Sequence, residues 1–98
     1  MRRAVRITED FWVGLELALP AGKEVSWHAF ASVDLPDVVE RFAVEWDTLL
    51  PLINGRSDYR ILIGTGRLVA AYSVEAQLAP DGTVELVTVT VDVNGLPE

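Results

Sequence analysis

The sequence lacks cysteine altogether and contains a single lysine, Lys23, among its 98 residues. Without cysteine, the chain can form neither a disulfide framework nor a thiolate metal site. No apolar run approaches the roughly 18 to 20 residues that cross a bilayer, and the charged start MRRAVRITED is not followed by the apolar stretch of a signal peptide. We therefore expect a cytoplasmic protein that forms one domain, because a chain of this length can build one core but not two.

Basic residues are scarce compared with acidic ones. The chain has 8 basic and 15 acidic residues and a net charge of −7; because three arginines lie within the first six positions, residues 7–98 hold 5 basic against 15 acidic side chains. Nucleic acids and anionic membrane surfaces are bound through clustered Lys and Arg, so we expect neither as a partner. A basic protein partner is favoured electrostatically, although the acidity also has a simpler explanation in solubility.

The clearest local pattern is a strand, a turn and a strand in residues 72–95. The turn APDGT, residues 79–83, is typical of a type I turn followed by a left-handed glycine. Beyond the turn, the alternation of apolar residues changes phase after Leu86. One extra residue at Leu86 or Val87, a β-bulge, restores the alternation. The bulge predicts three core-side pairs, namely Tyr72 with Val91, Val74 with Val89 and Ala70 with Val93, so that Val89, Val91 and Val93 face the helix.

A third strand is predicted before this hairpin. Residues 59–63 are apolar at alternate positions, and a two-residue turn at Thr65–Gly66 would join this strand to the next. The result is a three-stranded antiparallel meander over about residues 58–94 with one apolar face. The turn pairs Ile63 with Leu68, Ile61 with Ala70 and Tyr59 with Tyr72.

The segment DLPDVVERFAVEWDTLLPLING predicts a helix over about residues 35–50. Asp34 is suited to cap it, Pro36 suits its first turn, and Pro51 ends or kinks it. The side of this helix that is expected to face solvent is acidic, and it is either an ordinary solvated face or a surface for a basic partner. The predicted buried stripe is Val39, Phe42, Trp46, Leu49 and Leu50, and the acidic face is Asp37, Glu40, Glu45 and Asp47.

Residues 11–33 allow two interpretations. Apolar residues alternate on both sides of the turn PAGKE, which favours a β-hairpin. The alternative is a helix that begins after Thr8, with Glu9 and Asp10 in its first turn and Pro20 as its stop. In the hairpin, the face away from the core forms an aromatic patch suited to protein binding, unless residues 1–8 or a second subunit cover it. That face gathers Trp12, Gly14, Glu16, His28, Phe30 and Ser32.

Patterns that indicate catalysis are sparse. A Ser-His-Asp arrangement would depend on the single histidine, His28, and the sequence contains no nucleophile elbow. Metal ligands with a recognisable spacing are also lacking. We predict no catalytic residue, metal ligand or cofactor, and keep as an alternative a small enzyme that uses a pair of carboxylates.

The segments YRILIGTGRLVAAYSVEA (residues 59–76) and DGTVELVTVTV (residues 81–91) resemble the three closing strands of RelE/ParE-type toxins. The resemblance covers about a third of the chain and implies a toxin-like fold in which residues 8–19 are helical. The ribonuclease members of that family place basic or acid–base residues late in the sheet. The corresponding strand here offers Thr88, Thr90 and Asp92, which implies a toxin fold that lacks ribonuclease activity.

Together these patterns predict an α+β domain in which one main helix packs on an antiparallel sheet of five to six strands, in the order β-hairpin, helix, meander. One helix covers about three or four strands at a spacing of about 4.8 Å, so we also expect a homodimer that buries the remaining apolar surface. The leading hypothesis for function is a non-enzymatic acidic module, such as an inhibitor, immunity protein or chaperone, that binds a more basic protein. The predicted partner-binding residues are Trp12, Glu16, His28, Phe30, Asp37, Glu40 and Asp47.

Overall fold

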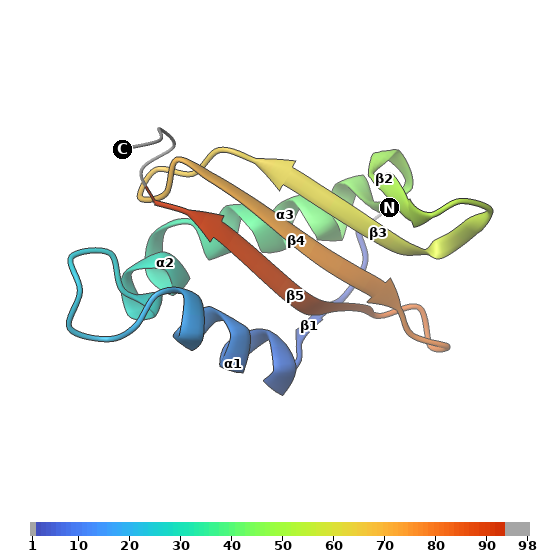
Figure 1. Ribbon diagram of the computed structural model, residues 1–98. Helices are drawn as coiled ribbons and strands as arrows, with labels where there is room; N and C mark the ends of the chain where they lie inside the picture. The colour runs from blue at the N-terminus through green and yellow to red at the C-terminus, as the bar shows by residue number, and fades with distance from the viewer. Residues whose placement is uncertain (1, 94–98) are drawn as a thin grey trace.

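The computed structural model describes residues 2–93 and shows an α+β domain in which helices pack on a five-stranded sheet (Figure 1). The sheet has the strand order β1-β5-β4-β3-β2; β1 runs parallel to β5, and the other neighbours are antiparallel. None of the helices formed by residues 2–93 has the length and apolar character needed to cross a membrane. The elements in chain order are β1 (Val5–Ile7), α1 (Glu9–Ala18), α2 (Trp27–Val33), α3 (Leu35–Glu45), the 3-10 helix η1 (Trp46–Thr48), β2 (Leu50–Ile53), β3 (Arg56–Gly64), β4 (Ala71–Leu78) and β5 (Val84–Asp92).

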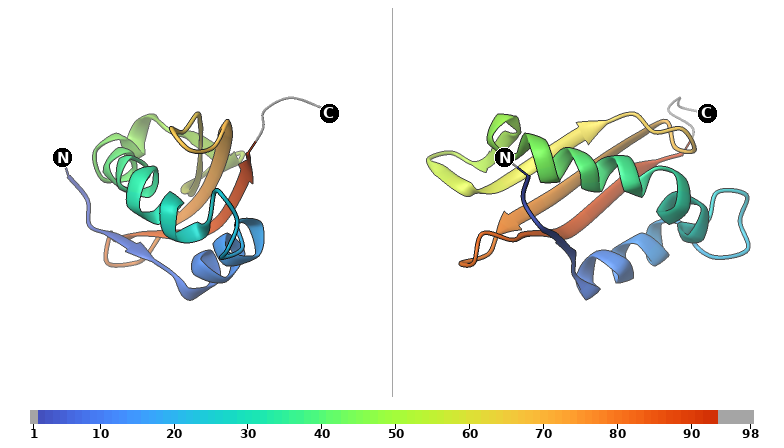
Figure 2. Two further views of the ribbon diagram at one scale, coloured as in Figure 1. Left: turned by 90° about the vertical axis from the view of Figure 1, so that its left-hand side faces the viewer. Right: turned by 180° about the vertical axis from the view of Figure 1, so that it is seen from behind.

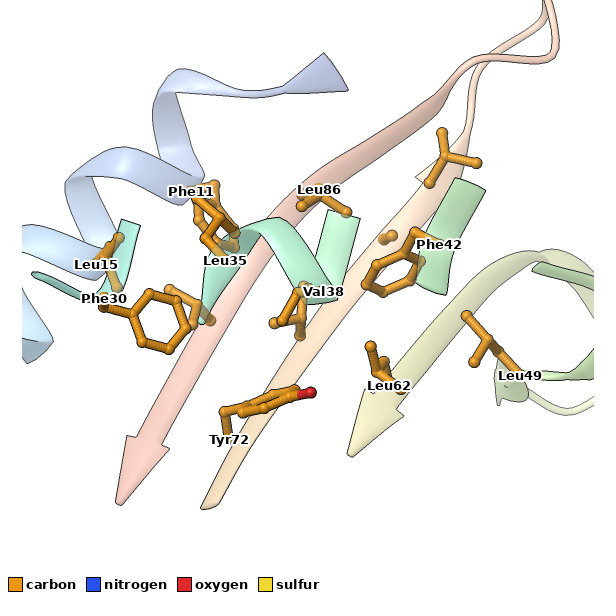
Figure 3. Packing of buried hydrophobic residues seen from close by; sticks show 14 of the residues in the cluster. Phe11, Leu15, Phe30, Leu35, Val38, Phe42, Leu49, Leu62, Tyr72 and Leu86 are labelled. Atoms are coloured by element: carbon orange, nitrogen blue, oxygen red, sulfur yellow. The ribbon is translucent and has the colours of Figure 1, made fainter. Parts of the chain in front are cut away.

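The prediction of α+β architecture is confirmed, but the sheet is mixed rather than purely antiparallel, and three helices cover it instead of one. All three contribute to one core on the same side of the sheet, and the views in Figure 2 show α3 lying across that side. The close-up of the core shows Phe11, Phe30 and Phe42 from the three helices directed toward strand residues such as Leu62 and Leu86 (Figure 3).

The β-hairpin predicted for residues 11–33 is wrong, because this segment forms α1 and α2. The reason lies in the alternation itself. Phe11, Leu15 and Leu19 are four residues apart, so they share one helix face, and all three are buried. The intervening apolar residues, Val13 and Leu17, are exposed.

Side-chain caps at both helix starts favour this choice. The Thr8 hydroxyl accepts a hydrogen bond from the backbone N–H of Phe11 and donates one to the carbonyl of Leu86. Ser26 accepts from the backbone N–H of Ala29 at the start of α2. These bonds satisfy N–H groups that a helix leaves without an internal partner.

The helix predicted for residues 35–50 is shorter than expected. It ends at Glu45, and the chain continues through η1 into β2. Of the predicted stripe, Phe42, Trp46 and Leu49 are buried. Val39 is half-buried, and Leu50 is exposed because it belongs to β2.

The predicted β4–β5 hairpin and its bulge are confirmed. Ala79 N–H donates to the carbonyl of Thr83 over 2.8 Å, and Gly82 has a φ of +88°, a conformation that glycine adopts without strain. The register shifts between Glu75 and Ala76, so that Val87 has no partner on β4. The observed pairs include Leu78 with Val84, Ala76 with Leu86, Val74 with Val89 and Tyr72 with Val91. Val89 is buried and Val91 packs against the core, whereas Val93, also predicted to face the helix, is exposed.

The predicted register between β3 and β4 is wrong. Residues 65–70 form a longer connection than the expected two-residue turn, and Tyr59 pairs with Gln77 rather than with Tyr72. The connection is held by Asp34, a buried residue between α2 and α3. Its carboxylate accepts hydrogen bonds from the backbone N–H groups of Arg67 (2.7 Å) and Leu68 (3.0 Å). Asp34 therefore precedes α3 as predicted, but its side chain fixes a distant loop instead of capping the helix.

Candidate functional site

The side of the sheet that faces away from the helices is the most prominent surface of the molecule, and we call it the open face. In Figure 1 it is turned toward the viewer, and within residues 2–93 no helix lies over it. Its side chains alternate with core residues such as Leu62 and Val74. The open face consists of Leu50 and Leu52 on β2, Tyr59, Ile61 and Ile63 on β3, Ser73, Glu75 and Gln77 on β4, and Glu85, Thr88 and Thr90 on β5.

One half of the open face is apolar. Ile63 is 62% exposed and Leu50 is 61% exposed, which is unusual for large aliphatic side chains in strands. Leu50 pairs directly with Ile61, so the apolar surface is continuous from β2 to β3. Contiguous exposed apolar surface of this kind is typical of an interaction site.

The other half is polar and carries a carboxylate at its centre. Glu75 lies between Ile61 of β3 and Thr88 of β5 in the sheet register, and it is partly buried. Within residues 2–93 its side chain has neither an ion-pair nor a hydrogen-bond partner. A partly desolvated carboxylate is stabilised by an adjacent cation, so this position is suited to a positive charge brought by a partner.

Two shallow hollows mark the open face. One of about 230 Å³ lies at one end of the sheet and is lined by Ile63, Ala71, Tyr72, Ser73, Thr90, Val91 and Asp92. The other, of about 140 Å³, lies between Tyr59 and Glu75 beside the bulge at Val87. Both are smaller than the roughly 300 to 1,000 Å³ of typical small-molecule sites, and they are better suited to receiving side chains of a protein.

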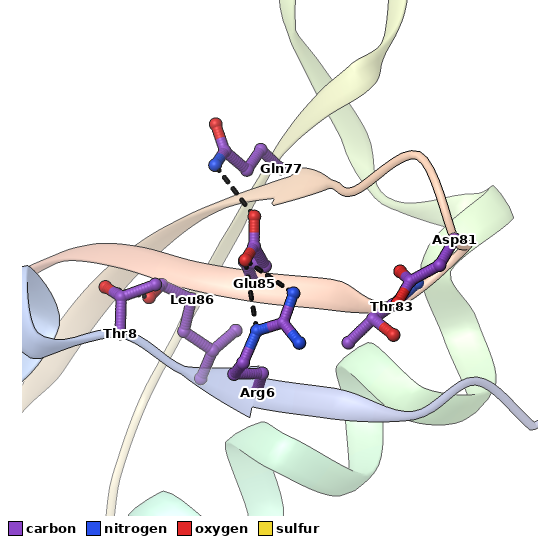
Figure 4. A network of polar contacts seen from close by, with 7 residues as sticks. All are labelled: Arg6, Thr8, Gln77, Asp81, Thr83, Glu85 and Leu86. Carbon is purple, nitrogen blue, oxygen red and sulfur yellow. Dashed lines mark hydrogen bonds and ion pairs between the residues drawn. The ribbon is translucent and has the colours of Figure 1, made fainter.

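At the corner of the open face next to β1, by contrast with Glu75, a carboxylate is paired with an arginine of the same chain (Figure 4). The guanidinium of Arg6 donates to Glu85 over 2.7 and 3.1 Å, and the side-chain amide of Gln77 donates to the other carboxylate oxygen. The hydrogen bond from Arg6, followed by that from Gln77, lowers the pKa of Glu85, and the same bond raises the pKa of Arg6. Glu85 is thus neutralised by the chain itself, whereas Glu75 is not.

The acidic face predicted on the 35–50 helix is also neutralised by the chain. Each of its four carboxylates lies within 4 Å of an arginine. Exposed pairs of this kind contribute little to stability, but they cancel the charge that would attract a basic partner. The pairs are Asp37 with Arg67, Glu40 with Arg2, Glu45 with Arg41 and Asp47 with Arg3.

The predicted aromatic face of the hairpin is not formed, because its members separate when residues 11–33 become helical. Phe30 is fully buried in the core, and Glu16 is exposed on α1. Trp12 and His28 instead meet at the junction of α1 and α2 through Trp27. The ring of Trp27 stacks on His28 at 3.6 Å and meets Trp12 edge-on at 6.2 Å.

The structure also bears on the enzyme alternative. Within residues 2–93 no group of three or more His, Cys, Asp or Glu side chains is arranged to hold a metal ion. Carboxylate pKa values that shift are lowered by hydrogen-bond donors, as in Asp58 beside Arg56 and Asp81 beside the backbone of Thr83. A general acid at neutral pH would need a raised pKa.

The sequence did not reveal the open face because ILI at 61–63 is apolar in both phases of a strand. The wrong register assigned Ile61 and Ile63 to the core. The signal that could have found the site is Glu75, which is the one charged residue in the strand 71–78.

Searches of protein-family models, of curated proteins and of solved structures gave no match to this chain.

Proposed function

We propose that the protein is a non-enzymatic binding module that holds a basic protein partner on the open face of its sheet. The observation that carries this proposal is the position of Glu75, a partly buried carboxylate without a counter-ion in residues 2–93, in the polar half of the open face and directly beside Ile61 of the apolar half. The apolar half would supply binding free energy through burial, and Glu75 would select a partner that brings a positive charge.

The distribution of the remaining charge supports a basic partner. Six of the seven arginines are engaged in ion pairs. The excess negative charge falls partly on α1, which carries Glu9, Asp10 and Glu16 and no basic residue. Figure 1 shows α1 beside β5, at the edge of the open face. The negative electrostatic potential of the α1 carboxylates therefore adds to that of Glu75.

An inhibitor, an immunity protein or a chaperone would each use such a surface to cover a basic protein. The partner itself can be isolated from the native host with the full chain as bait and identified by mass spectrometry. Its affinity is then measured between about 0.1 M and about 1 M salt, over which the Debye length falls from about 10 to about 3 Å. We expect the affinity to fall as the salt concentration rises.

Two matched substitutions test the surface. Ile63→Ala removes apolar area from the open face, and Val44→Ala removes an aliphatic side chain that is 46% exposed on α3. We expect Ile63→Ala to weaken binding about tenfold, corresponding to about 1.4 kcal/mol, and Val44→Ala to leave it unchanged. An acidic partner, or an affinity insensitive to both salt and Ile63→Ala, would contradict the proposal.

A second copy of the chain is the alternative occupant, in line with the predicted homodimer. Two-fold pairing through the open face would bury the same apolar residues. It would also bring two Glu75 carboxylates into one interface, and like charges in an interface oppose association. Sedimentation equilibrium at micromolar concentration separates the two arrangements, because a monomer keeps a mass near 10.8 kDa and a dimer has twice that mass.

A further inference from the structure

We infer that the partner presents an amphipathic α-helix to the open face, with its apolar stripe along β3 and a Lys or Arg beside the stripe over Glu75. This inference rests on the proposed binding function and specifies the shape of the segment that is bound. It follows from the backbone of the sheet, the spacing of the β3 side chains and the place of the carboxylate.

The first step concerns the backbone of the occupant. On the open face the inner strands direct their N–H and C=O groups at neighbouring strands, not outward. An extended segment lying on Ile61 and Ile63 would leave its own backbone groups without partners over apolar side chains, which costs free energy. A helix satisfies its backbone internally and brings only side chains to the surface.

The second step concerns spacing. Tyr59, Ile61 and Ile63 lie two residues apart on one strand, a repeat of about 6.8 Å. Residues four apart on a helix repeat at about 6 Å. Three successive apolar residues of a helix therefore stay close to the three β3 side chains over about two turns.

The third step concerns charge. Glu75 is the direct neighbour of Ile61, so it lies about one strand spacing, about 4.8 Å, to one side of the stripe and opposite its midpoint. On the other side, Leu50 and Leu52 extend the apolar surface. The bound helix would accordingly be apolar toward β2 and basic toward β4.

The chain's own exposed helix surface does not meet this requirement. On α1, Val13 and Leu17 form an exposed apolar pair one turn apart, but Glu9, Asp10 and Glu16 surround them. A second copy that docked α1 on the open face would place like charges beside Glu75. The charge pattern thus favours a foreign helix with basic flanks over a second copy.

Model peptides test the inference with the full-length, ¹⁵N-labelled protein. The first is a peptide of about 18 residues, roughly five helical turns, with leucines at helical spacing and lysines on both flanks. The second has the same composition, with leucine and lysine alternating so that it is amphipathic only as a strand. The third has the first pattern with glutamate in place of lysine.

We expect the first peptide to shift the backbone amide resonances of residues 59–63 and 73–77. The second and third peptides should bind at least about tenfold more weakly, because one lacks the helical stripe and the other repels Glu75. Glu75→Gln should lower the affinity for the first peptide about two- to fivefold. The control Asp37→Asn, at an ion-paired carboxylate on α3, should leave the affinity for the first peptide unchanged.

Equal binding of the alternating peptide at the same residues would overturn the helical occupant and leave the binding proposal intact. Shifts confined to α1 or α3, or no shifts with the first peptide, would also overturn it. The binding proposal is decided separately, by the response of the native partner to salt and to Ile63→Ala.

Discussion

The two hairpins that share β4 are built in different ways. In the β4–β5 hairpin, the turn and the bulge are formed by residues of the hairpin itself, including the Ala79–Thr83 hydrogen bond, Gly82 and the unpaired Val87, and Thr8 adds hydrogen bonds to Leu86 from outside it. In the β3–β4 hairpin, the connection is held by Asp34, which is 33 residues away from Arg67 in the sequence. Local sequence can specify the first register, whereas the second connection has, besides the local Gly66–Val69 hydrogen bond, a contact that exists only in the folded chain.

This difference decides which side chains form the candidate site. The predicted pairing of Tyr59 with Tyr72 and the observed pairing with Gln77 differ by five residues. Because side chains alternate along a strand, an odd shift exchanges the two faces of β3. In the observed register Leu62 lies in the core, and Ile61 and Ile63, which were predicted to face the core, lie on the open face.

The largest expected effect tests this exchange within one strand. Leu62→Ala removes a side chain that is 2% exposed and should reduce the free energy of unfolding by about 2 to 4 kcal/mol through lost burial and a cavity. Ile63→Ala removes a side chain that faces solvent and should cost below about 1 kcal/mol. Urea denaturation of both variants measures the two values, and a larger loss for Ile63→Ala would show that the register of β3 is wrong.

A smaller effect is expected from the distant contact that holds the β3–β4 connection. Asp34→Ala leaves the backbone N–H groups of Arg67 and Leu68 without their acceptor and should cost about 2 to 3 kcal/mol. Hydrogen exchange of these two amides should speed up more than exchange in the β4–β5 turn.

The matched change in the local hairpin is Asp81→Ala, which removes an exposed carboxylate that accepts from the N–H of Thr83. We expect a loss of about 0.5 to 1 kcal/mol. If Asp34→Ala were no more disruptive than Asp81→Ala, the long-range contact would not control the β3–β4 register.

The smallest effect concerns pH and the Arg6–Glu85 pair, which joins β1 to the local hairpin. Hydrogen bonds from Arg6 and Gln77 lower the pKa of Glu85 in the folded protein. The stabilisation is therefore complete above the unfolded pKa of about 4.3 and is lost as the pH falls from there through the lower folded value. Thermal unfolding between about pH 6 and about pH 3 should show a smaller decline for Glu85→Gln than for the original chain.

The control for this measurement is Glu16→Gln on α1, since Glu16 makes no ion pair within residues 2–93. Its decline in stability with pH should match that of the original chain. An unchanged decline in Glu85→Gln would mean that the Arg6–Glu85 pair does not contribute to the acid sensitivity of the fold.

The sequence by itself determined the features whose causes are local. The turn residues and the phase change at Leu86 predicted the β4–β5 register and its bulge, and the spacing of Phe42, Trp46 and Leu49 predicted that these residues lie in the core. The overall acidity also follows from composition alone.

Only the tertiary structure decided the remaining features. Some segments fit both a helical and a strand periodicity, and some side chains have partners that are distant in the sequence. The alternating residues 11–19 contain a helical stripe as well as a strand pattern, and packing of Phe11, Leu15 and Leu19 into the core selects the helix. The carboxylates of α3 and η1 form an acidic face in the sequence pattern, but in the fold the N-terminal Arg2 and Arg3 and the distant Arg67 pair with three of them, while Arg41 pairs with Glu45 within α3. Asp34 likewise accepts hydrogen bonds from Arg67 and Leu68 in the connection between β3 and β4, a contact that no local pattern contains.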